Sequence, residues 1–527
     1  MELRQGVIQR ILLFAVLSSA SPCLLAQHHL SGGVESNSVY YQDDRKTGAA
    51  VPENNLGSNN YFKLDYQYHK FSAGIQYEAY LPVLQGLPTA LHGSDLVLKY
   101  ASFQDSNFRV TAGDFYEQFG NGLVFRAYEE RALGLNTALE GIRASYSFGN
   151  GIRLKALAGR PREFMDRAES VVKGASVQVD WTTLLGLNRS SFTTEANYIN
   201  RYVSYTGQAA IDPNVNAYSF GGNWVAGGFS LEGEYAYKTN DPGAYNGQAN
   251  KDGSALLLRA GYTASGFGSL LSFRRLEYMQ FGTSRGIAGI GRDLNYLPAL
   301  TRQYSYSLAN LQPHNAMGNS EIGGQLDLHY RLKRGSWLGG RYGASVALNA
   351  STYYNLKGDV VGGYAFLDKG DTRYYQDINV DVEKKISPSL QLLLLYSNQV
   401  YNPIVIGKVN TLYFSQVAVA DLTWKVSAVR SFRFEMQHLW SNDYQKNWAA
   451  GMAEFAISPA WTCFVGDMYN YGDTDTHYYN GGCSYTVSRT RLALNYGRNR
   501  EGVICAGGVC LYMPAYTGFN LSLISSF

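Results

Sequence analysis

The stretch that decides the fold lies between residues 142 and 158 and reads IRASYSFGNGIRLKALA. Apolar side chains occupy every second position on both sides of Asn150-Gly151. This spacing is typical of β-strands, because successive side chains in a strand point to opposite faces. Asn-Gly is the preferred pair for a two-residue hairpin turn, since both positions need positive φ. The segment therefore predicts two antiparallel strands joined by a tight turn.

The other face of this hairpin carries Arg143, Arg153 and Lys155. Charged side chains are costly in lipid and tolerable in water, so these residues indicate a wet lumen on one side and lipid on the other. The stretch FKLDYQYH at residues 62–69 repeats the pattern with other residues. The sequence therefore predicts an all-β fold, a single transmembrane antiparallel β-barrel.

The N-terminus has the features of a secretory signal peptide. Arg4 and Arg10 precede an apolar run at residues 11–17, which small residues follow. The apolar run is too short for a membrane anchor, so we expect cleavage after Ala26, which removes residues 1–26 and leaves residues 27–527 as the barrel domain. Lipidation of Cys23 is the alternative, but Pro22 occupies the position where a small, flexible residue is expected.

The composition also favours a membrane-spanning β-barrel over other classes of protein. After the signal peptide, no stretch approaches the roughly 18 consecutive apolar residues that a membrane helix needs. The chain has 42 Tyr and 56 Gly but only 13 Pro; Tyr suits the two bilayer interfaces of a barrel, and Gly suits its turns. A net charge of +3 argues against a nucleic-acid partner, which would normally require a basic patch.

Turn-forming residues separate the alternating segments along the whole chain. With both termini in the periplasm and long loops outside, they predict about 24 strands, within a range of about 20 to 26. A soluble β-sandwich or propeller is the alternative, but soluble chains seldom alternate over so many hairpins. The expected short periplasmic turns lie near His69, Asp105, Gly151, Gly186, Gly227, Gly266, Arg334, Pro388, Ala428, Pro459 and Ser488.

The chain ends in FNLSLISSF, an alternating segment that stops on an aromatic residue. Such an ending resembles the signal that the outer-membrane barrel assembly machinery reads in a terminal strand. We therefore expect that machinery and outer-membrane lipid as partners. The residues assigned to the signal are Phe519, Leu521, Leu523 and Phe527.

Three motifs carry a family resemblance: GDFYEQFGNGL at 113–123 with Arg126, Glu130 and Arg131 after it, LNYLPAL at 294–300, and CAGGVCLYMPA at 505–515. Together they resemble a family of outer-membrane β-barrel proteins of unknown function from Bacteroides-type bacteria. The resemblance covers the whole mature chain and implies location and fold, without catalytic or ligand residues. The first motif is also similar to alginate-export-type porins.

A barrel this wide leaves an aqueous lumen unless something fills it. The first strand begins near Leu30, so we expect no N-terminal plug domain and disfavour a TonB-dependent receptor. The long connections at 117–138 and 279–319 are the candidates for narrowing the lumen, with a charged constriction that selects solutes by sign and size. The alternative is that these charges are simply solvated. The candidate residues are Glu117, Arg126, Glu129, Glu130, Arg131, Arg143, Arg153 and Lys155.

The expected function is a porin-like channel for small solutes. The alternative is a non-conducting barrel that acts as a binding platform or as part of an outer-membrane secretion or uptake complex. An enzyme is disfavoured, because the eight His are scattered and form no familiar catalytic spacing. The segment 473–477, DTDTH, resembles a calcium loop but lacks its glycine and distal Glu, so an ordinary hairpin tip is favoured. We predict no cofactor and no metal site.

The mature chain keeps four cysteines, and export to an oxidising compartment favours disulfides. Cys505 and Cys510 flank a flexible Ala-Gly-Gly-Val link and are expected to form one bridge, in the last outer loop before the closing strand. Cys463 and Cys483 lie at nearly equal distances from the hairpin tip around Asp473 and can meet on one face. This second bridge depends on register, because a slip of one residue would separate the sulfurs.

Overall fold

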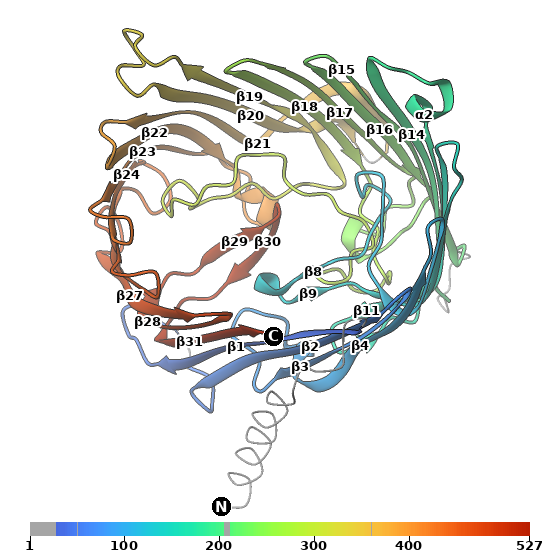
Figure 1. Cartoon of the computed structure of the whole chain (residues 1–527), viewed down its shortest axis with the longest axis horizontal. Coiled ribbons are helices and arrows are strands. Elements are labelled where there is room, and N and C mark those ends of the chain that lie inside the picture. Colours follow the sequence, from blue (N-terminus) through green and yellow to red (C-terminus); the bar gives the residue numbers. More distant parts are fainter. Residues whose placement is uncertain (1–27, 50, 205–210, 360) are drawn as a thin grey trace, which may run out of the picture.

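The computed structural model describes residues 28–49, 51–204, 211–359 and 361–527, so the expected signal peptide and Cys23 lie outside the described residues. The chain forms one closed antiparallel barrel of 24 strands (Figure 1). Each wall strand pairs with the wall strands before and after it, and β1 (His28–Gln42) pairs with β31 (Tyr516–Ser526) to close the ring. The fold class and the strand count predicted from the sequence are confirmed.

The remaining wall strands alternate in direction around the ring. They are β2 (Leu56–Tyr68), β3 (Phe71–Tyr80), β4 (Gly93–Gln104), β5 (Phe108–Phe115), β10 (Leu139–Ser147), β11 (Ile152–Glu163), β13 (Val171–Asp180), β14 (Ser190–Tyr202), β15 (Asn214–Ala226), β16 (Phe229–Lys238), β17 (Gly253–Ala264), β18 (Phe267–Glu277), β19 (Ser320–Leu332), β20 (Ala344–Asp359), β21 (Gly363–Lys385), β22 (Leu390–Tyr401), β23 (Tyr413–Lys425), β24 (Ser431–Trp440), β25 (Trp448–Ala456), β26 (Trp461–Asn470), β27 (Thr476–Val487) and β28 (Thr490–Asn499).

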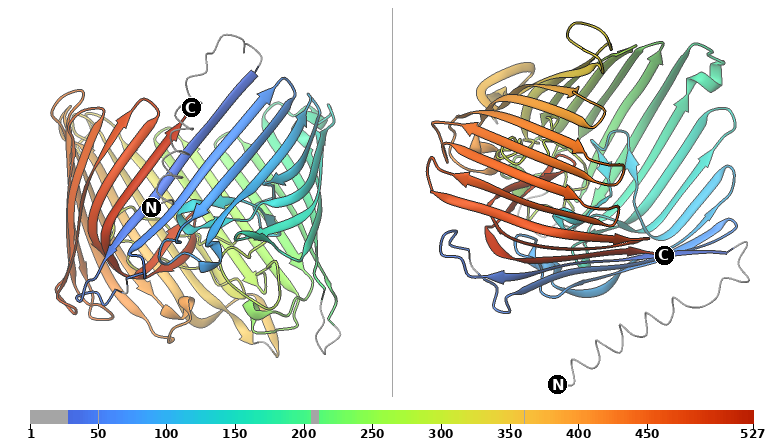
Figure 2. Two further views of the ribbon diagram at one scale, coloured as in Figure 1. Left: turned by 90° about the horizontal axis from the view of Figure 1, so that it is seen from below. Right: turned by 60° about the vertical axis from the view of Figure 1, so that its left-hand side comes forward.

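Short connections gather at one end of the barrel, here called the short-turn end (Figure 2). All the turns predicted from the sequence lie at this end, where β1 begins and β31 stops. One of them contains helix α2 (Trp181–Leu185), whose first turn is capped by the Asp180 carboxylate and whose end is marked by Gly186 in the left-handed region. The opposite end carries the longer connections and is called the long-loop end.

The turn after β10 differs from the expected two-residue type. β10 stops at Ser147 and β11 starts at Ile152, and Gly151 has a φ of 91° whereas Asn150 keeps an ordinary negative φ. Both central residues of the predicted turn would need positive φ. The chain instead makes a longer loop, and only its glycine uses the left-handed region.

The outer wall of the barrel is apolar. Exposed side chains such as Phe71, Ile142, Leu271 and Leu494 alternate along their strands with residues that face the lumen. This alternation is what a strand between lipid and an interior requires. Phe519 and Leu521 of the terminal strand are also exposed on this wall, and the backbone of Phe527 pairs with that of Gly32.

Among the described residues, no helix combines the length and the apolar character that membrane crossing requires.

Both expected cysteine pairs lie at disulfide distance. Cys463 on β26 is directly opposite Cys483 on β27, with 4.0 Å between their Cα atoms. Cys505 and Cys510 face each other across the short hairpin of β29 (Gly502–Ala506) and β30 (Val509–Met513), also with 4.0 Å between Cα atoms. The register of β26 and β27 therefore places Cys463 and Cys483 on the same face, as the second bridge requires.

Candidate functional site

The candidate site is the lumen, which three connections enter from the long-loop end. The first inward loop, residues 116–138, carries the short strands β6 (Gln118–Phe119), β7 (Phe125–Arg126), β8 (Glu129–Glu130) and β9 (Leu135–Asn136). The second inward loop covers residues 278–319. The third inward loop is the β29–β30 hairpin, and Figure 1 shows it inside the ring of wall strands together with β8 and β9. The sequence predicted the entry of the first two but placed the third among the outer loops.

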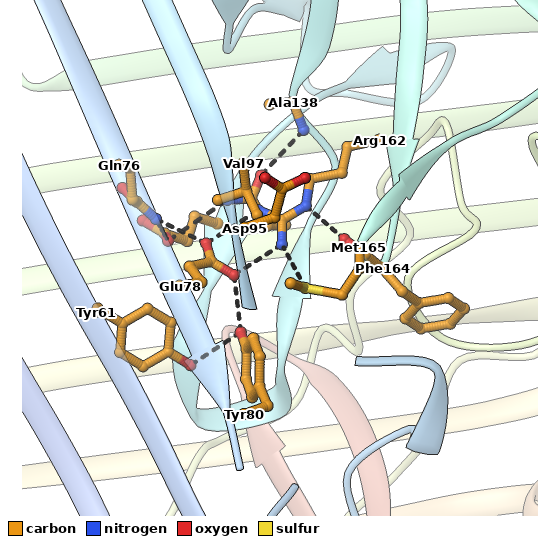
Figure 3. A network of polar contacts seen from close by, with 12 residues as sticks. Tyr61, Gln76, Glu78, Tyr80, Asp95, Val97, Ala138, Arg162, Phe164 and Met165 are labelled. Carbon is orange, nitrogen blue, oxygen red and sulfur yellow. Dashed lines mark hydrogen bonds and ion pairs between the residues drawn. The ribbon is translucent and has the colours of Figure 1, made fainter. Parts of the chain in front are cut away.

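A buried ion pair on the inner wall forms the centre of the polar network to which the first inward loop attaches (Figure 3). Arg162 on β11 donates to both carboxylate oxygens of Glu78 on β3, at 2.9 and 2.7 Å, and both side chains are 1% exposed. The Tyr80 hydroxyl donates to the same carboxylate at 2.9 Å, and Arg162 also donates to the Phe164 carbonyl at 2.6 Å. A buried charge must be paired and hydrogen-bonded in this way to be tolerated.

The first inward loop attaches directly to this network. The Gln76 amide donates to Glu78 at 2.8 Å and to Glu129 of the loop at 2.7 Å. Arg131 of the loop pairs with Glu129 and, at 2.7 Å, with Glu35 on β1. Burial alone would lower the pKa of Arg131, but the charges of Glu129 and Glu35 raise it above its usual value. The loop is thus tied to β1 and β3 by charged contacts.

The second inward loop is tied to the wall by a second buried charge cluster. Asp241, in the connection after β16, pairs with Arg201 on β14 at 2.7 Å and with Arg285 of the loop at 2.9 Å. Burial would raise the pKa of Asp241, but the adjacent Arg201 lowers it below its usual value. Lys238 donates to the Gln280 carbonyl at 2.9 Å. These contacts hold the start of the loop against β14 and β16.

The same loop continues to the far side of the lumen. Arg302 pairs with Asp381 on β21 at 2.6 Å, and the Tyr304 hydroxyl donates to Asp377 at 2.6 Å. Further along, the Tyr306 hydroxyl donates to Asp421 on β23 at 3.1 Å. The loop therefore spans the lumen and is anchored on both sides.

The inward loops also pack on one another. The Asn295 amide donates to the Leu123 carbonyl at 3.0 Å, and the guanidinium of Arg126 lies 3.8 Å from the centre of the Tyr296 ring. The third inward loop joins through the Ala299 N–H, which donates to the Gly508 carbonyl at 3.0 Å. Three segments far apart in the sequence thus form one structure inside the barrel.

An apolar core lies between these loops and the wall. Its loop residues include Phe119, Phe125 and Phe281, all buried, and its wall residues include three alanines. Ala217, Ala236 and Ala255 have no exposed surface and come from three successive strands. Small apolar side chains on the lumen face leave room for a loop to pack there. These alanines are the signal that the sequence analysis missed, since it expected only a wet lumen on this face.

The structure separates the candidate constriction residues into four groups. Arg126 lies against the rings of Tyr128 and Tyr296, while Glu129 and Arg131 join the Glu78–Arg162 network through Gln76. The Glu130 carboxylate accepts from the Ala132 N–H and caps the short helix that follows.

The fourth group comprises Glu117 of the first inward loop and its neighbours on the wall toward the short-turn end. Arg143 and Lys155 both pair with Glu117 at 3.2 Å, and Arg153 donates to the Ser147 hydroxyl at 3.0 Å. Since Glu117 belongs to an inward loop, these contacts confirm that Arg143 and Lys155 face the lumen.

Comparison with known proteins gives distant structural likenesses. The P pilus usher (PapC) translocation pore is 12% identical, with a TM-score of 0.44, covering 94% of this chain and 99% of that one. The siderophore receptor PirA from Pseudomonas aeruginosa is 10% identical, with a TM-score of 0.41, covering 95% and 80%. The copper transporter OprC is 8% identical, with a TM-score of 0.41, covering 96% and 82%. Likeness at this level carries no argument about function.

The sequence itself has a family but no curated relative. No curated protein matches the chain. The pattern of one family, described as "Family of unknown function (DUF6029)", matches residues 4–527. This agrees with the resemblance drawn from the three motifs, while the bacterial source that the resemblance implies stays a prediction. The chain belongs to this family of unknown function.

Proposed function

We propose that the chain is an outer-membrane channel for small solutes, narrowed by its three inward loops. The observation that carries the proposal is that ion pairs tie the loops crossing the lumen to the rest of the barrel on several sides: Arg131 with Glu35, Arg285 with Asp241, and Arg302 with Asp381. Such contacts hold the loops in one arrangement and suit an aperture of fixed size. Toward the short-turn end, exposed charges such as Arg109 and Arg153 keep the wall wet.

Outer-membrane location is part of this proposal. It is supported by the closed ring of strands and the apolar outer wall. With the usual arrangement of such barrels, the short turns and both termini would lie in the periplasm, and the long connections outside.

Planar bilayer recordings test the channel. The wild-type barrel should give stable conductance steps. A variant in which residues 118–136 are replaced by a short Gly-Ser linker should give steps that are several-fold larger, because the first inward loop no longer occupies the lumen. Retained heat-modifiable gel mobility would show that both proteins fold as barrels.

A non-conducting barrel is the second candidate, and one observation favours it. The second inward loop packs Tyr304, Tyr306 and Leu308 against wall residues of β22 to β25 in a dry cluster, in addition to the core around Phe119. Dry clusters of this kind exclude water from part of the lumen. If the wild type gives no conductance steps while the loop-replacement variant conducts, the inward loops seal the lumen and the barrel serves as a binding platform. Proteins that copurify with the barrel would then identify its partners.

A further inference from the structure

A basic pocket of about 390 Å³ lies on the lumen wall near the short turns after β4 and β10. Here it is called the basic pocket. This volume falls in the range of roughly 300 to 1,000 Å³ that is usual for small-molecule sites. Four cationic side chains line it: Arg109, Arg143, Arg153 and Lys155.

The pairing of the strands explains why a hollow forms there. On the central strand β10, Ser145 is directly opposite Arg109 on one side and Lys155 on the other. Ser147 is opposite Arg153. Small serines on the middle strand and long cations on its two neighbours leave a depression whose rim is positively charged.

Acidic side chains neutralise only part of this charge. The pocket is lined by two carboxylates, those of Asp105 and Glu117. Asp105 pairs with Lys70 at 2.8 Å, outside the set of four cations. Glu117 pairs with both Arg143 and Lys155 at 3.2 Å. Within the described part of the chain, Arg109 has no carboxylate at ion-pair distance, and the side chain of Arg153 donates only to Ser147.

We propose that the basic pocket binds a small polyanion, a solute with two or three carboxylate or phosphate charges. Such a solute would pair with Arg109 and Arg153 at the wet rim and approach Arg143 and Lys155, which Glu117 holds from the loop side. Arginine suits both carboxylates and phosphates because its planar fork donates two parallel hydrogen bonds. The idea that the bound anion is a transported solute rests on the channel proposed above. Anion binding in the pocket does not depend on that proposal.

Calorimetry on the purified barrel in detergent tests the site with citrate and pyrophosphate as probes and glucose as the neutral control. We expect saturable binding of at least one anion, weakened by salt because exposed charges are screened. The relative affinities of citrate and pyrophosphate then show whether carboxylate or phosphate is preferred. The double variant R109Q/R153Q should lose about tenfold or more in affinity, since it removes two charge-assisted contacts.

The matched control is R334Q/R341Q, which removes the same charge from the turn after β19, away from the pocket. It should bind like the wild type. The proposal is overturned if neither anion binds, or if both double variants bind the anions as tightly as the wild type.

Reversal potentials in a salt gradient separate this inference from the channel itself. A barrel that binds anions but does not conduct would contradict the channel proposal and support the anion site. If the wild type conducts but binds no anion, and R109Q/R153Q has the same reversal potential as the wild type, the anion site is contradicted and the channel proposal is supported.

Discussion

Charged side chains differ in burial and in pairing between two regions of the same lumen. Where the inward loops fill it, charged side chains such as Glu78 and Arg162 are almost fully buried and each has a close partner. In the basic pocket the cations outnumber the acids, and Arg109 and Arg153 remain exposed. Burial forces a charge to be paired, whereas water tolerates an unpaired one. The first region is therefore suited to holding a structure together, and the second to meeting a solute.

The largest effect is expected from breaking the pair in Figure 3. Arg162→Ala leaves the Glu78 carboxylate buried without its main partner, and should lower the free energy of unfolding by about 3–5 kcal/mol. Denaturant titration of the barrel in detergent measures this. The control is Arg153→Ala at the wet rim, which should change stability by about 0.5 kcal/mol or less.

A double variant sharpens the same comparison. E78M/R162M replaces both charges by apolar side chains and leaves no charge buried, so it should be considerably more stable than Arg162→Ala alone. If the double variant is no more stable than the single one, the loss comes from packing rather than from an unpaired charge.

Next in size are the two disulfides. The chain-entropy argument gives about 3 kcal/mol for Cys463–Cys483 and about 2 kcal/mol for Cys505–Cys510, because the first closes the longer loop. Their sequence separations are 20 and 5. Serine replacement of each pair followed by denaturant titration checks the order, and mass spectrometry of unreduced peptides checks the pairing. Equal losses, or crossed pairs, would contradict the assignment.

A smaller effect is expected at Gly120, where the first inward loop meets the wall. Its φ is 53°, and a Cβ there would lie 2.5 Å from a carboxylate oxygen of Glu234. That carboxylate accepts from the Asn121 N–H at 2.6 Å, so it can move only by losing this bond. Gly186 is the matched control, with a φ of 64° and open space around it. Gly120→Ala should therefore cost about 1–2 kcal/mol more than Gly186→Ala; equal losses would show that only backbone strain matters.

The ring of strands follows from short-range signals and was predictable. Alternation and turn residues are local, and each hairpin reports its own strands without knowledge of the rest. Even the opposition of Cys463 and Cys483 depended only on the distance of each from one hairpin tip. Only the detailed turn at Asn150-Gly151 was wrong, because more than one loop type accepts a glycine with positive φ.

The interior of the barrel was less predictable, since it depends on contacts between distant segments. Charges close together in the sequence, such as Arg126 and Arg131, take different partners because each meets a different wall strand or loop. The sequence of the third inward loop is that of an ordinary hairpin, and contacts with distant segments, such as the second loop and the cluster around Tyr61 and Tyr80, place it in the lumen. The sequence analysis missed Arg109 because the other cations of the pocket come from two other strands, β10 and β11.

The smallest effect on stability, and the sharpest test of the contrast between the two regions, is expected from Glu117→Gln. Glu117 is the internal anion of the basic pocket, held by Arg143 and Lys155 in partly exposed ion pairs. Such pairs contribute about 1 kcal/mol or less, so unfolding should change little. Removing the carboxylate frees both cations and raises the net charge of the pocket, so citrate or pyrophosphate should bind about 3- to 10-fold more tightly. Calorimetry in the same detergent measures the change. Weaker anion binding in the variant would mean that Glu117 orients the cations for the solute instead of competing with it.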